Sequence, residues 1–385
     1  MTDNRTETPV RRLAGMLKST LLFMLMLVVV FAVIEGISST VLFGYDFLSS
    51  IRQAALPEGI FQEPDDLLGW RTIPNSDMPD LFGAGQALRA NEQGFRNAQN
   101  FSADRPANRV RAVCSGYSFT FGYGVSNEYT WCSRFAADRS DVESANLGQP
   151  GYGVGQAYLR YCRDTYELAH DIHLFAVIPD DFRRMRLNRF VGTNKPYFTV
   201  RDGVVSLQNV PVPESSRLTV WWTLNQGVIT ELRSAQFVNK LIARLSGSGR
   251  SKPGLGMLES RDLAWSILEQ VHKMTVARSA KLVLVYLPEQ TMPMSLGEDW
   301  RRLIEAFAAQ HEETFVDVYS HVHRLPVEQR NALFSPAWGH LSKAGNQLVS
   351  DLIWDTLGKD WQPAGSLHLA AKHAYSSPCP ASGVK

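Results

Sequence analysis

A serine directly after a short apolar run is the first residue of this sequence that could carry chemistry. Residues 110–114 predict a strand, Gly116 follows it, and Ser118 opens the turn into the next element. In an open parallel sheet, ligands bind at the carboxyl ends of the strands. A hydroxyl at that place can act as a nucleophile, with helix N-terminal amides nearby to hold an oxyanion. Taken alone, the same pattern also fits a simple capping turn.

Two further segments carry groups that would complete such a site. Residues 146–153 read Asn-Leu-Gly-Gln-Pro-Gly-Tyr-Gly, a glycine-rich loop in which Gly148 can present its backbone N–H to an anionic oxygen. Residues 334–345 place His340 in a loop just before a predicted helix. A histidine there is a candidate general base for Ser118. Together the segments predict a serine nucleophile with a base and an oxyanion donor.

The order of these segments, with two more upstream, resembles the SGNH (GDSL-type) hydrolases, specifically their membrane-anchored bacterial group. The upstream pieces are Leu-Gly-Trp-Arg at 68–71 and Asn-Glu-Gln-Gly-Phe-Arg at 91–96. The similarity runs from about residue 68 to residue 357. The resemblance implies a flavodoxin-like, three-layer α/β/α fold with a mostly parallel sheet, and acyl-ester hydrolysis or acyl transfer on carbohydrate or lipid substrates. It also implies that Ser118 is the nucleophile, His340 the base and Gly148 an oxyanion donor.

Three positions depart from the family pattern. Tyr117 stands where the family has an aspartate beside the nucleophile, Asp180 stands where it has the oxyanion asparagine, and residues 337–339 lack the aspartate expected before the histidine. An ionised Asp180 cannot donate a hydrogen bond, and losing one oxyanion donor lowers kcat by about 10²–10³. Losing the acid that orients the histidine can lower it by about 10⁴. Protonation of Asp180 beside Asp181, or a carboxylate reaching His340, would offset these losses, and Asp181 is the candidate supporting acid.

Two functions follow from this balance of retained and lost residues. The first is a serine esterase or acyl hydrolase that acts on ester-linked acyl groups of envelope carbohydrate or lipid, and the surviving Ser118 and His340 favour it. The second is a catalytically inactive protein of the same fold that binds an acylated glycan or an envelope-assembly partner. Serine chemistry needs no cofactor. A net charge of +1 gives no reason to expect a nucleic-acid partner.

His321 and His323 are the pair that a metal ion could use. Residues two apart on a strand share a face, and imidazoles are common zinc ligands. No third ligand is evident in the sequence. Solvated loop histidines are therefore the preferred interpretation, and no metal site is predicted.

The N-terminal part predicts a membrane anchor at residues 19–43. Residues 19–34 carry no charge, and the apolar stretch then supplies the roughly 20 residues that a spanning helix needs. A cleaved signal peptide is the alternative, but the run is long and no small-x-small cleavage site follows it. Because four cations precede the stretch and mostly acidic residues follow it, residues 1–18 are expected in the cytoplasm. The main domain is then expected outside the bacterial cell membrane, in the periplasmic or extracellular space.

The rest of the chain predicts one α/β domain. We expect a lead-in at 44–109, the domain at 110–360 with an insertion at about 186–225, and a disordered tail at 361–385. Short apolar runs alternate with amphipathic helices, which argues for a mostly parallel sheet covered on both faces. The strand candidates are residues 110–114, 172–178, 281–287 and 315–318, with a hairpin at 197–207. The helix candidates are residues 129–138, 155–168, 227–245, 258–280, 297–310 and 342–357.

The four cysteines, Cys114, Cys132, Cys162 and Cys379, match neither a zinc-binding spacing nor a dense disulfide framework. One bridge could form in an oxidising compartment. Buried free thiols are the preferred interpretation, including Cys114 on the strand that leads to Ser118.

Overall fold

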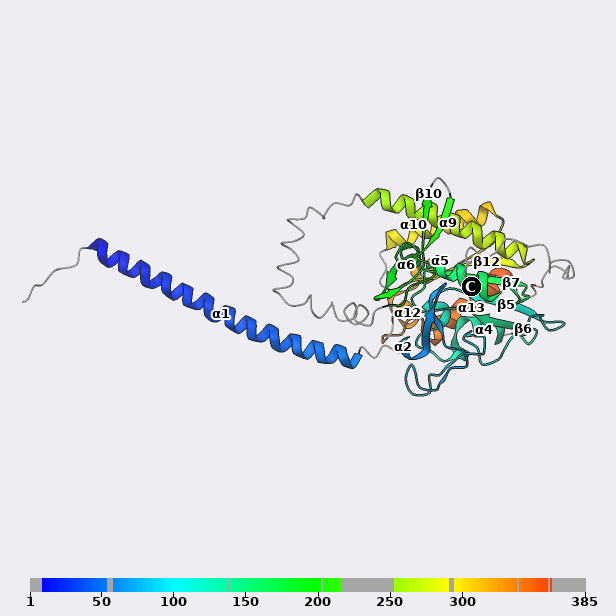
Figure 1. The fold of residues 1–385 in the computed structure, drawn as a ribbon, viewed down its shortest axis with the longest axis horizontal. Helices are drawn as coiled ribbons and strands as arrows, with labels where there is room; N and C mark the ends of the chain where they lie inside the picture. Colours follow the sequence, from blue (N-terminus) through cyan, green and yellow to red (C-terminus); the bar gives the residue numbers. More distant parts are fainter. Residues whose placement is uncertain are drawn as a thin grey trace, which may run out of the picture. The chain divides into compact units, whose positions relative to one another are not determined.

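The computed structural model describes residues 9–53, 58–137, 139–201, 204–215, 253–290, 294–337, 339–358 and 361 (Figure 1). The helix α1 (Pro9–Gln53) and the α/β domain belong to two separate compact units, and each is described by itself. The helix predicted at 227–245 and nearly all of the tail predicted at 361–385 lie outside the described residues.

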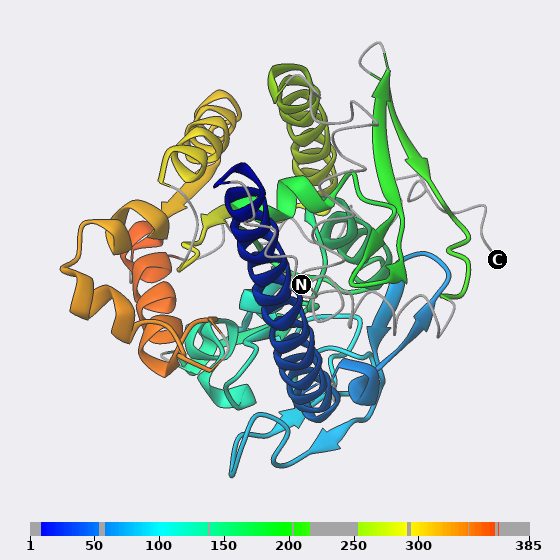
Figure 2. The same ribbon diagram turned by 90° about the vertical axis from the view of Figure 1, so that its left-hand side faces the viewer.

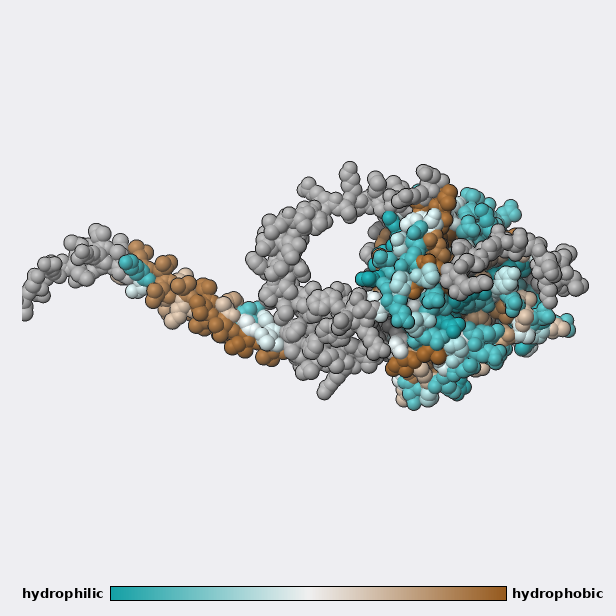
Figure 3. Space-filling model, viewed as in Figure 1, coloured by the Kyte–Doolittle hydropathy of each residue, from teal (hydrophilic) through white to brown (hydrophobic). Residues whose placement is uncertain are grey.

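Helix α1 contains the predicted anchor. Its section Met16–Val41 has 26 residues and contains an 18-residue window with a mean hydropathy of 2.6, in which none of the scored side chains is buried. Figure 3 shows this section as an apolar surface along the helix. A helix of 26 residues is about 39 Å long, which exceeds the roughly 30 Å of a bilayer's hydrocarbon core. The section is therefore long and apolar enough to cross a membrane, and a signal sequence shares these properties.

The domain is built on a sheet of five parallel strands in the order β13-β12-β7-β5-β6. Numbered along the chain and read from β6, this order is 2-1-3-4-5, the flavodoxin-like arrangement. It confirms the predicted fold class. The strands are β5 (Val110–Ser115), β6 (Val142–Asn146), β7 (Ile172–Val177), β12 (Lys281–Tyr286) and β13 (Thr314–Asp317).

Helices cover both faces of this sheet (Figures 1 and 2). Helices α4 and α13 pack against each other in one layer, while α9 packs against α5 and α10 in the other. Every residue of β5 and β7 is buried, as expected for parallel strands with both faces covered. The layer helices are α4 (Trp131–Ala137), α5 (Val154–Asp164), α9 (Pro253–Ala277), α10 (Met294–Gln310) and α13 (Lys343–Leu357).

Short elements connect the layers and carry most of the loops. The short helices are α2 (Glu58–Phe61), α3 (Ser118–Phe121), η1 (Asn127–Tyr129), α6 (Pro179–Arg184), α11 (Val318–His323) and α12 (Val327–Ala332). The two-stranded pairs are β1 (Gln62–Asp65) with β2 (Gly69–Thr72), β3 (Asp77–Met78) with β4 (Leu88–Arg89), β8 (Arg189–Phe190) with β9 (Thr193–Asn194), and β10 (Tyr197–Arg201) with β11 (Val204–Gln208). The last pair is the hairpin predicted at 197–207.

The strand geometry assumed for His321 and His323 was wrong. Both residues lie on the short helix α11, where neighbours two apart point in different directions. His323 Nδ1 is 2.9 Å from the carbonyl oxygen of Tyr319, one turn earlier in the same helix.

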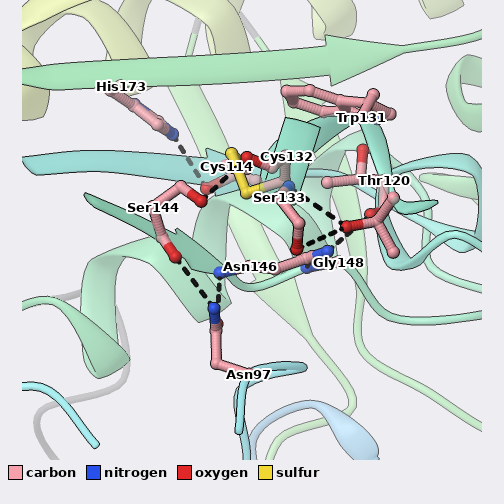
Figure 4. The surroundings of a disulfide bond; sticks show 12 residues. Asn97, Cys114, Thr120, Trp131, Cys132, Ser133, Ser144, Asn146, Gly148 and His173 are labelled. Atoms are coloured by element: carbon pink, nitrogen blue, oxygen red, sulfur yellow. Dashed lines mark hydrogen bonds between the residues drawn. A yellow bond between two sulfur atoms is a disulfide. The ribbon is translucent and has the colours of Figure 1, made fainter. Parts of the chain in front are cut away.

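The cysteine interpretation was also wrong, because Cys114 and Cys132 form a disulfide (Figure 4). Cys114 lies on β5 and Cys132 on α4, and no described cysteine is free. The bridge closes the segment that contains Ser118 and joins the strand before it to the helix after it. The pairing could not be predicted because it depends on how the chain returns from residue 118 to the sheet.

Removing this bridge should destabilise the domain. The two cysteines are 18 positions apart, and closing a loop of this size is worth about 3 kcal/mol through the entropy of the unfolded chain. We expect the double variant Cys114→Ala/Cys132→Ala to lose about this much free energy of unfolding, measured by denaturant unfolding of the full chain in detergent. Ser133→Ala, on the same helix, serves as the control, and equal midpoints for both variants would contradict the expectation.

Candidate active site

The turn after β5 places Ser118 at the carboxyl edge of the sheet. β5 lies between β6 and β7, where the chain connections leave in opposite directions, the place at which such sheets bind ligands. Gly116 in this turn has φ +156°, and a Cβ there would lie 2.8 Å from the Ala176 carbonyl oxygen and 2.2 Å from Thr120 Oγ1. Only glycine therefore fits between the turn and β7. Ser118 then begins α3 and is 8% exposed.

The structure brings Ser118 and His340 together across 222 positions of sequence. His340 Nε2 is 2.8 Å from Ser118 Oγ, within hydrogen-bond distance. The loop that carries His340 is short and closed. The Ser335 N–H donates to the His340 carbonyl oxygen at 2.7 Å, and Phe334 pairs with Leu341 across the loop. This arrangement is that of a nucleophile beside its base.

The imidazole of His340 also packs against two aromatic rings from the segment that follows Ser118. Its centroid is 4.8 Å from that of Phe119 and 5.0 Å from that of Tyr123, with interplanar angles of 48° and 35°. Both aromatic side chains are at least 95% buried. His340 is thus held by the segment that begins with Ser118.

A buried arginine binds the far end of helix α3. The Arg96 guanidinium donates to the carbonyl oxygens of Phe121 at 2.5 Å and Gly122 at 2.6 Å, and also to that of Val125. It lies 4.5 Å from the centroid of the Phe121 ring, and the side chain is 1% exposed. Burial lowers the pKa of Arg96 to about 9, opposed by the charge of Glu128, so the group stays charged at neutral pH. A cation at a helix C-terminus is favourable, and these carbonyls have no access to water.

Gly148 lies against α3, but its N–H is occupied. A Cβ at Gly148 would lie 2.2 Å from the backbone nitrogen of Phe121, so the loop can approach the helix only as glycine. The Gly148 N–H donates to Asn146 Oδ1 at 2.9 Å, and Asn146 Nδ2 donates to the Thr120 carbonyl oxygen at 2.9 Å (Figure 4). The structure therefore gives Gly148 a packing role, and its expected presentation of an N–H to an oxyanion is not seen.

Asp180 is ion-paired, which disfavours the protonated form that would have offset the loss of the asparagine. Its two carboxylate oxygens accept from Arg183 Nε and Arg184 Nε, each at 2.7 Å. Burial opposes ionisation, but the two guanidinium groups outweigh it and hold the pKa of Asp180 below its ordinary value. The side chain is therefore a neutralised carboxylate that cannot donate to an oxyanion.

Asp181 is buried at the third position of α6, and its side chain bonds back to the N-cap residue of that helix. Its Oδ2 accepts from the Ile178 N–H at 3.1 Å, and Arg184 Nη1 is 3.8 Å from its Oδ1. Burial raises the pKa of Asp181 well above its ordinary value, against the nearby charge of Arg184. The contacts resolved for Asp181 are thus with α6 itself, and they do not support its candidate role as the acid behind His340.

A further acidic group, Glu289, follows strand β12 at the same edge of the sheet. Burial and then the charge of Asp180 raise the pKa of Glu289 to about 7, although Arg184 and Arg183 oppose this. Tyr117, in the place of the family aspartate, is 1% exposed, and its ring packs 5.4 Å from that of Phe119. Burial, with the charges of Asp181 and Glu289, raises the pKa of Tyr117 well above its ordinary value. Tyr117 therefore stays neutral and fills space beside the nucleophile.

Sequence reasoning missed the residues that support the nucleophile turn from outside. Arg96 belongs to the 91–96 block, which had been used only as part of the family resemblance. Asn97 Nδ2 donates to the Ser144 carbonyl oxygen, and Asn97 Oδ1 accepts from the Asn146 N–H, so this amide pairs with β6 as a neighbouring strand would (Figure 4). The one cation in the block Asn-Glu-Gln-Gly-Phe-Arg at 91–96 was the available signal for Arg96. Among the described residues, no cluster of three or more His, Cys, Asp or Glu side chains could hold a metal ion.

No family model and no curated protein matches this chain. Solved structures similar to it include a lipase/acylhydrolase from Enterococcus faecalis, which is 13% identical with a TM-score of 0.37 over 67% of this chain and 100% of that one. Another is a member of the lipolytic protein G-D-S-L family from Veillonella parvula, 13% identical with a TM-score of 0.36 over 64% of this chain and 97% of that one. The second belongs to the family that the sequence segments resemble. The fold assignment rests on the strand order itself.

Replacing Arg96 should disturb both stability and the site. In Arg96→Gln the carbonyls of Phe121 and Val125 lose their donor, while that of Gly122 keeps only the bond from the Val125 N–H at 3.3 Å. Buried unpaired carbonyls cost about 1–3 kcal/mol each. We expect a loss of about 3 kcal/mol or more in the free energy of unfolding. Denaturant unfolding measures it, with the exposed Arg89→Gln as the control that should change stability by less than about 0.5 kcal/mol. A loss for Arg96→Gln no larger than that control would refute the assignment.

The raised pKa of Glu289 predicts a pH-dependent cost of folding. The unfolded carboxyl titrates near 4.5 and the folded one at about 7, so the folded state binds more protons in between. The contribution of the neutral Glu289 carboxyl to the free energy of unfolding is fully present below pH 4.5 and is lost as the pH rises through 7. Glu289→Gln should therefore be about 2–3 kcal/mol more stable relative to the parent at pH 8 than at pH 4.5. Unfolding curves at both pH values test this, and a pH-independent difference would contradict it.

Proposed function

We propose that this protein is a membrane-anchored serine esterase of the SGNH type that hydrolyses ester-linked acyl groups of envelope carbohydrate or lipid. The observation that carries the proposal is the 2.8 Å contact between Ser118 Oγ and His340 Nε2 at the carboxyl edge of the sheet. A serine and a histidine in such contact form the minimal unit of nucleophilic acyl transfer.

In the acylation step, His340 Nε2 removes the hydroxyl proton of Ser118 while Ser118 Oγ bonds to the carbonyl carbon of the ester. The carbonyl electron pair moves onto its oxygen and forms a tetrahedral oxyanion. When this collapses, the bond to the leaving oxygen breaks, and the imidazolium returns the proton to the departing alcohol. A water molecule, activated by His340 in the same way, then releases the acid from the acyl-serine.

Oxyanion stabilisation would come from backbone donors near Ser118. The Ser118 N–H stands at the first position of α3, where a helix offers no intrahelical acceptor. The positively charged Arg183 and Arg184 neutralise Asp180, which removes the repulsion that a bare carboxylate would exert on a developing oxyanion. With the Gly148 N–H engaged by Asn146, this set of donors is smaller than the family pattern implies.

We place the domain outside the cell membrane, with α1 as the anchor and residues 1–18 on the cytoplasmic side. The cations before the apolar section support this orientation. The disulfide between Cys114 and Cys132 supports it independently, because such bonds persist in oxidising compartments and are rare in the cytosol. We also propose the domain boundaries that the sequence predicts for the lead-in, for the domain with its insertion, and for the tail.

A second candidate is a non-catalytic protein of the same fold that binds an acylated glycan or an envelope-assembly partner. The engaged Gly148 N–H and the ion-paired Asp180 favour it, because they leave two of the family's oxyanion positions without a free donor. The two candidates differ in whether Ser118 reacts.

Reaction with a fluorophosphonate probe decides between them. We expect the full chain in detergent to be labelled, Ser118→Ala to be unlabelled, and His340→Ala to react at least about 10³-fold more slowly because the base is missing. Ser144→Ala, which removes a buried serine outside the site, should label like the parent. If the folded parent remains unlabelled, the esterase proposal is wrong and the non-catalytic binding protein takes its place.

A further inference from the structure

We infer that Phe119 and Tyr123 are positioning residues for His340: their rings hold the imidazole against Ser118 and favour its protonated form during the reaction. The inference rests on the proposed function, in which His340 is the base. It concerns how the base is oriented, which the family pattern assigns to an aspartate that residues 337–339 do not contain.

Both rings lie within the range of a cation–π interaction. The His340 centroid is 4.8 Å from Phe119 and 5.0 Å from Tyr123, and attraction between a cation and a ring extends to about 6 Å. The neutral imidazole gains an aromatic contact with each ring. The imidazolium that forms when Ser118 loses its proton gains the additional attraction of two electron-rich rings.

We call the rings of Phe119 and Tyr123 the clamp, and the backbone connects this clamp to Ser118. The N–H groups of Gly122 and Tyr123 both donate to the Ser118 carbonyl oxygen, at 2.9 and 3.0 Å. Gly122 has φ +78°, which lets the chain reverse directly after α3 and return Tyr123 to the His340 side. Phe119 is the next residue after the nucleophile. The positions of both rings relative to Ser118 are therefore set by five residues of chain.

Each ring is backed by a further aromatic side chain. Phe119 packs 5.4 Å from Tyr117, and Tyr123 packs 5.0 Å from Phe82 of the lead-in. Phe82 and Tyr123 belong to a second apolar cluster together with Phe61, Leu88 and Phe121. Because Phe119 and Tyr123 are 5% and 4% exposed, neither has room to turn away from the imidazole.

The physical consequence is a base whose orientation is restricted by two ring contacts. An imidazole packed against both rings keeps Nε2 directed at Ser118 Oγ, and less orientational freedom has to be lost in the transition state. Stabilisation of the imidazolium lowers the barrier for proton removal from the serine.

The test compares fluorophosphonate reaction rates of full-chain variants in detergent. Phe119→Leu and Tyr123→Leu should each react about 3- to 10-fold more slowly than the parent, the range expected for one ring contact. Tyr123→Phe keeps the ring and should restore the parent rate. Phe101→Leu is the matched control, since Phe101 is 6% exposed and packs against Phe95, away from His340.

Leucine variants that react within twofold of the parent while losing as much thermal stability as Phe101→Leu would overturn the inference. So would a Tyr123→Phe variant as slow as Tyr123→Leu, because the hydroxyl and not the ring would then matter.

Crystal structures of the leucine variants give a readout that does not depend on turnover. Separation of His340 Nε2 from Ser118 Oγ beyond about 3.5 Å would support the clamp, and an unchanged contact would refute it. An unlabelled parent, in contrast, removes the proposed esterase and leaves the crystallographic comparison to decide the positioning role.

Discussion

The candidate site depends on one requirement of the polypeptide backbone: the carbonyl groups at the end of helix α3 are buried and must be paired. The helix is only four residues long, so its own hydrogen bonds cannot satisfy them. Arg96 meets the need with a guanidinium that reaches the carbonyls of Phe121, Gly122 and Val125. The nucleophile turn is thereby closed at one end by the disulfide of Cys114 and at the other by a charge from the lead-in.

The need to pair these buried carbonyl groups also explains why the lead-in is part of the candidate site. Its residues Arg96 and Asn97 pair with α3 and with the edge strand β6, while Phe82 supports Tyr123. An unpaired edge strand is exposed to non-native pairing, and an asparagine that satisfies its backbone groups closes the edge without adding a full strand. The lead-in thus fixes the shape of the turn that carries Ser118. It also supports Tyr123, one of the two rings that contact His340.

The charge of each acidic residue at the carboxyl edge of the sheet depends on whether it has a cationic partner. Asp180 faces two guanidinium groups and is held ionised. Asp181 is buried and Glu289 is partly buried, both with less compensation, so both are pushed toward the neutral form. Three acids within one region therefore differ in charge because burial and ion pairing compete differently at each. This pattern keeps net negative charge low in the surroundings of Tyr117, on which Asp181 and Glu289 act.

The sequence by itself determined the features that depend on local pattern. The alternation of apolar runs and amphipathic helices predicted the parallel sheet, the strand before Ser118, the helix after His340, the hairpin at 197–207 and the apolar helix at the N-terminus. These follow from periodicity and composition within a few residues of each other. The ordered segments around Ser118, Gly148 and His340 also predicted the candidate site.

Only the tertiary structure decided how those segments meet. The 2.8 Å contact of Ser118 with His340, the pairing of Cys114 with Cys132, and the use of the Gly148 N–H by Asn146 each join residues through the fold's packing. The sequence left open whether Asp180 is ionised or protonated, because its arginine partners act only once α6 has formed. Distances, burial and charge pairing are properties of contacts, and a linear pattern of residue types does not encode which contact a given group will make.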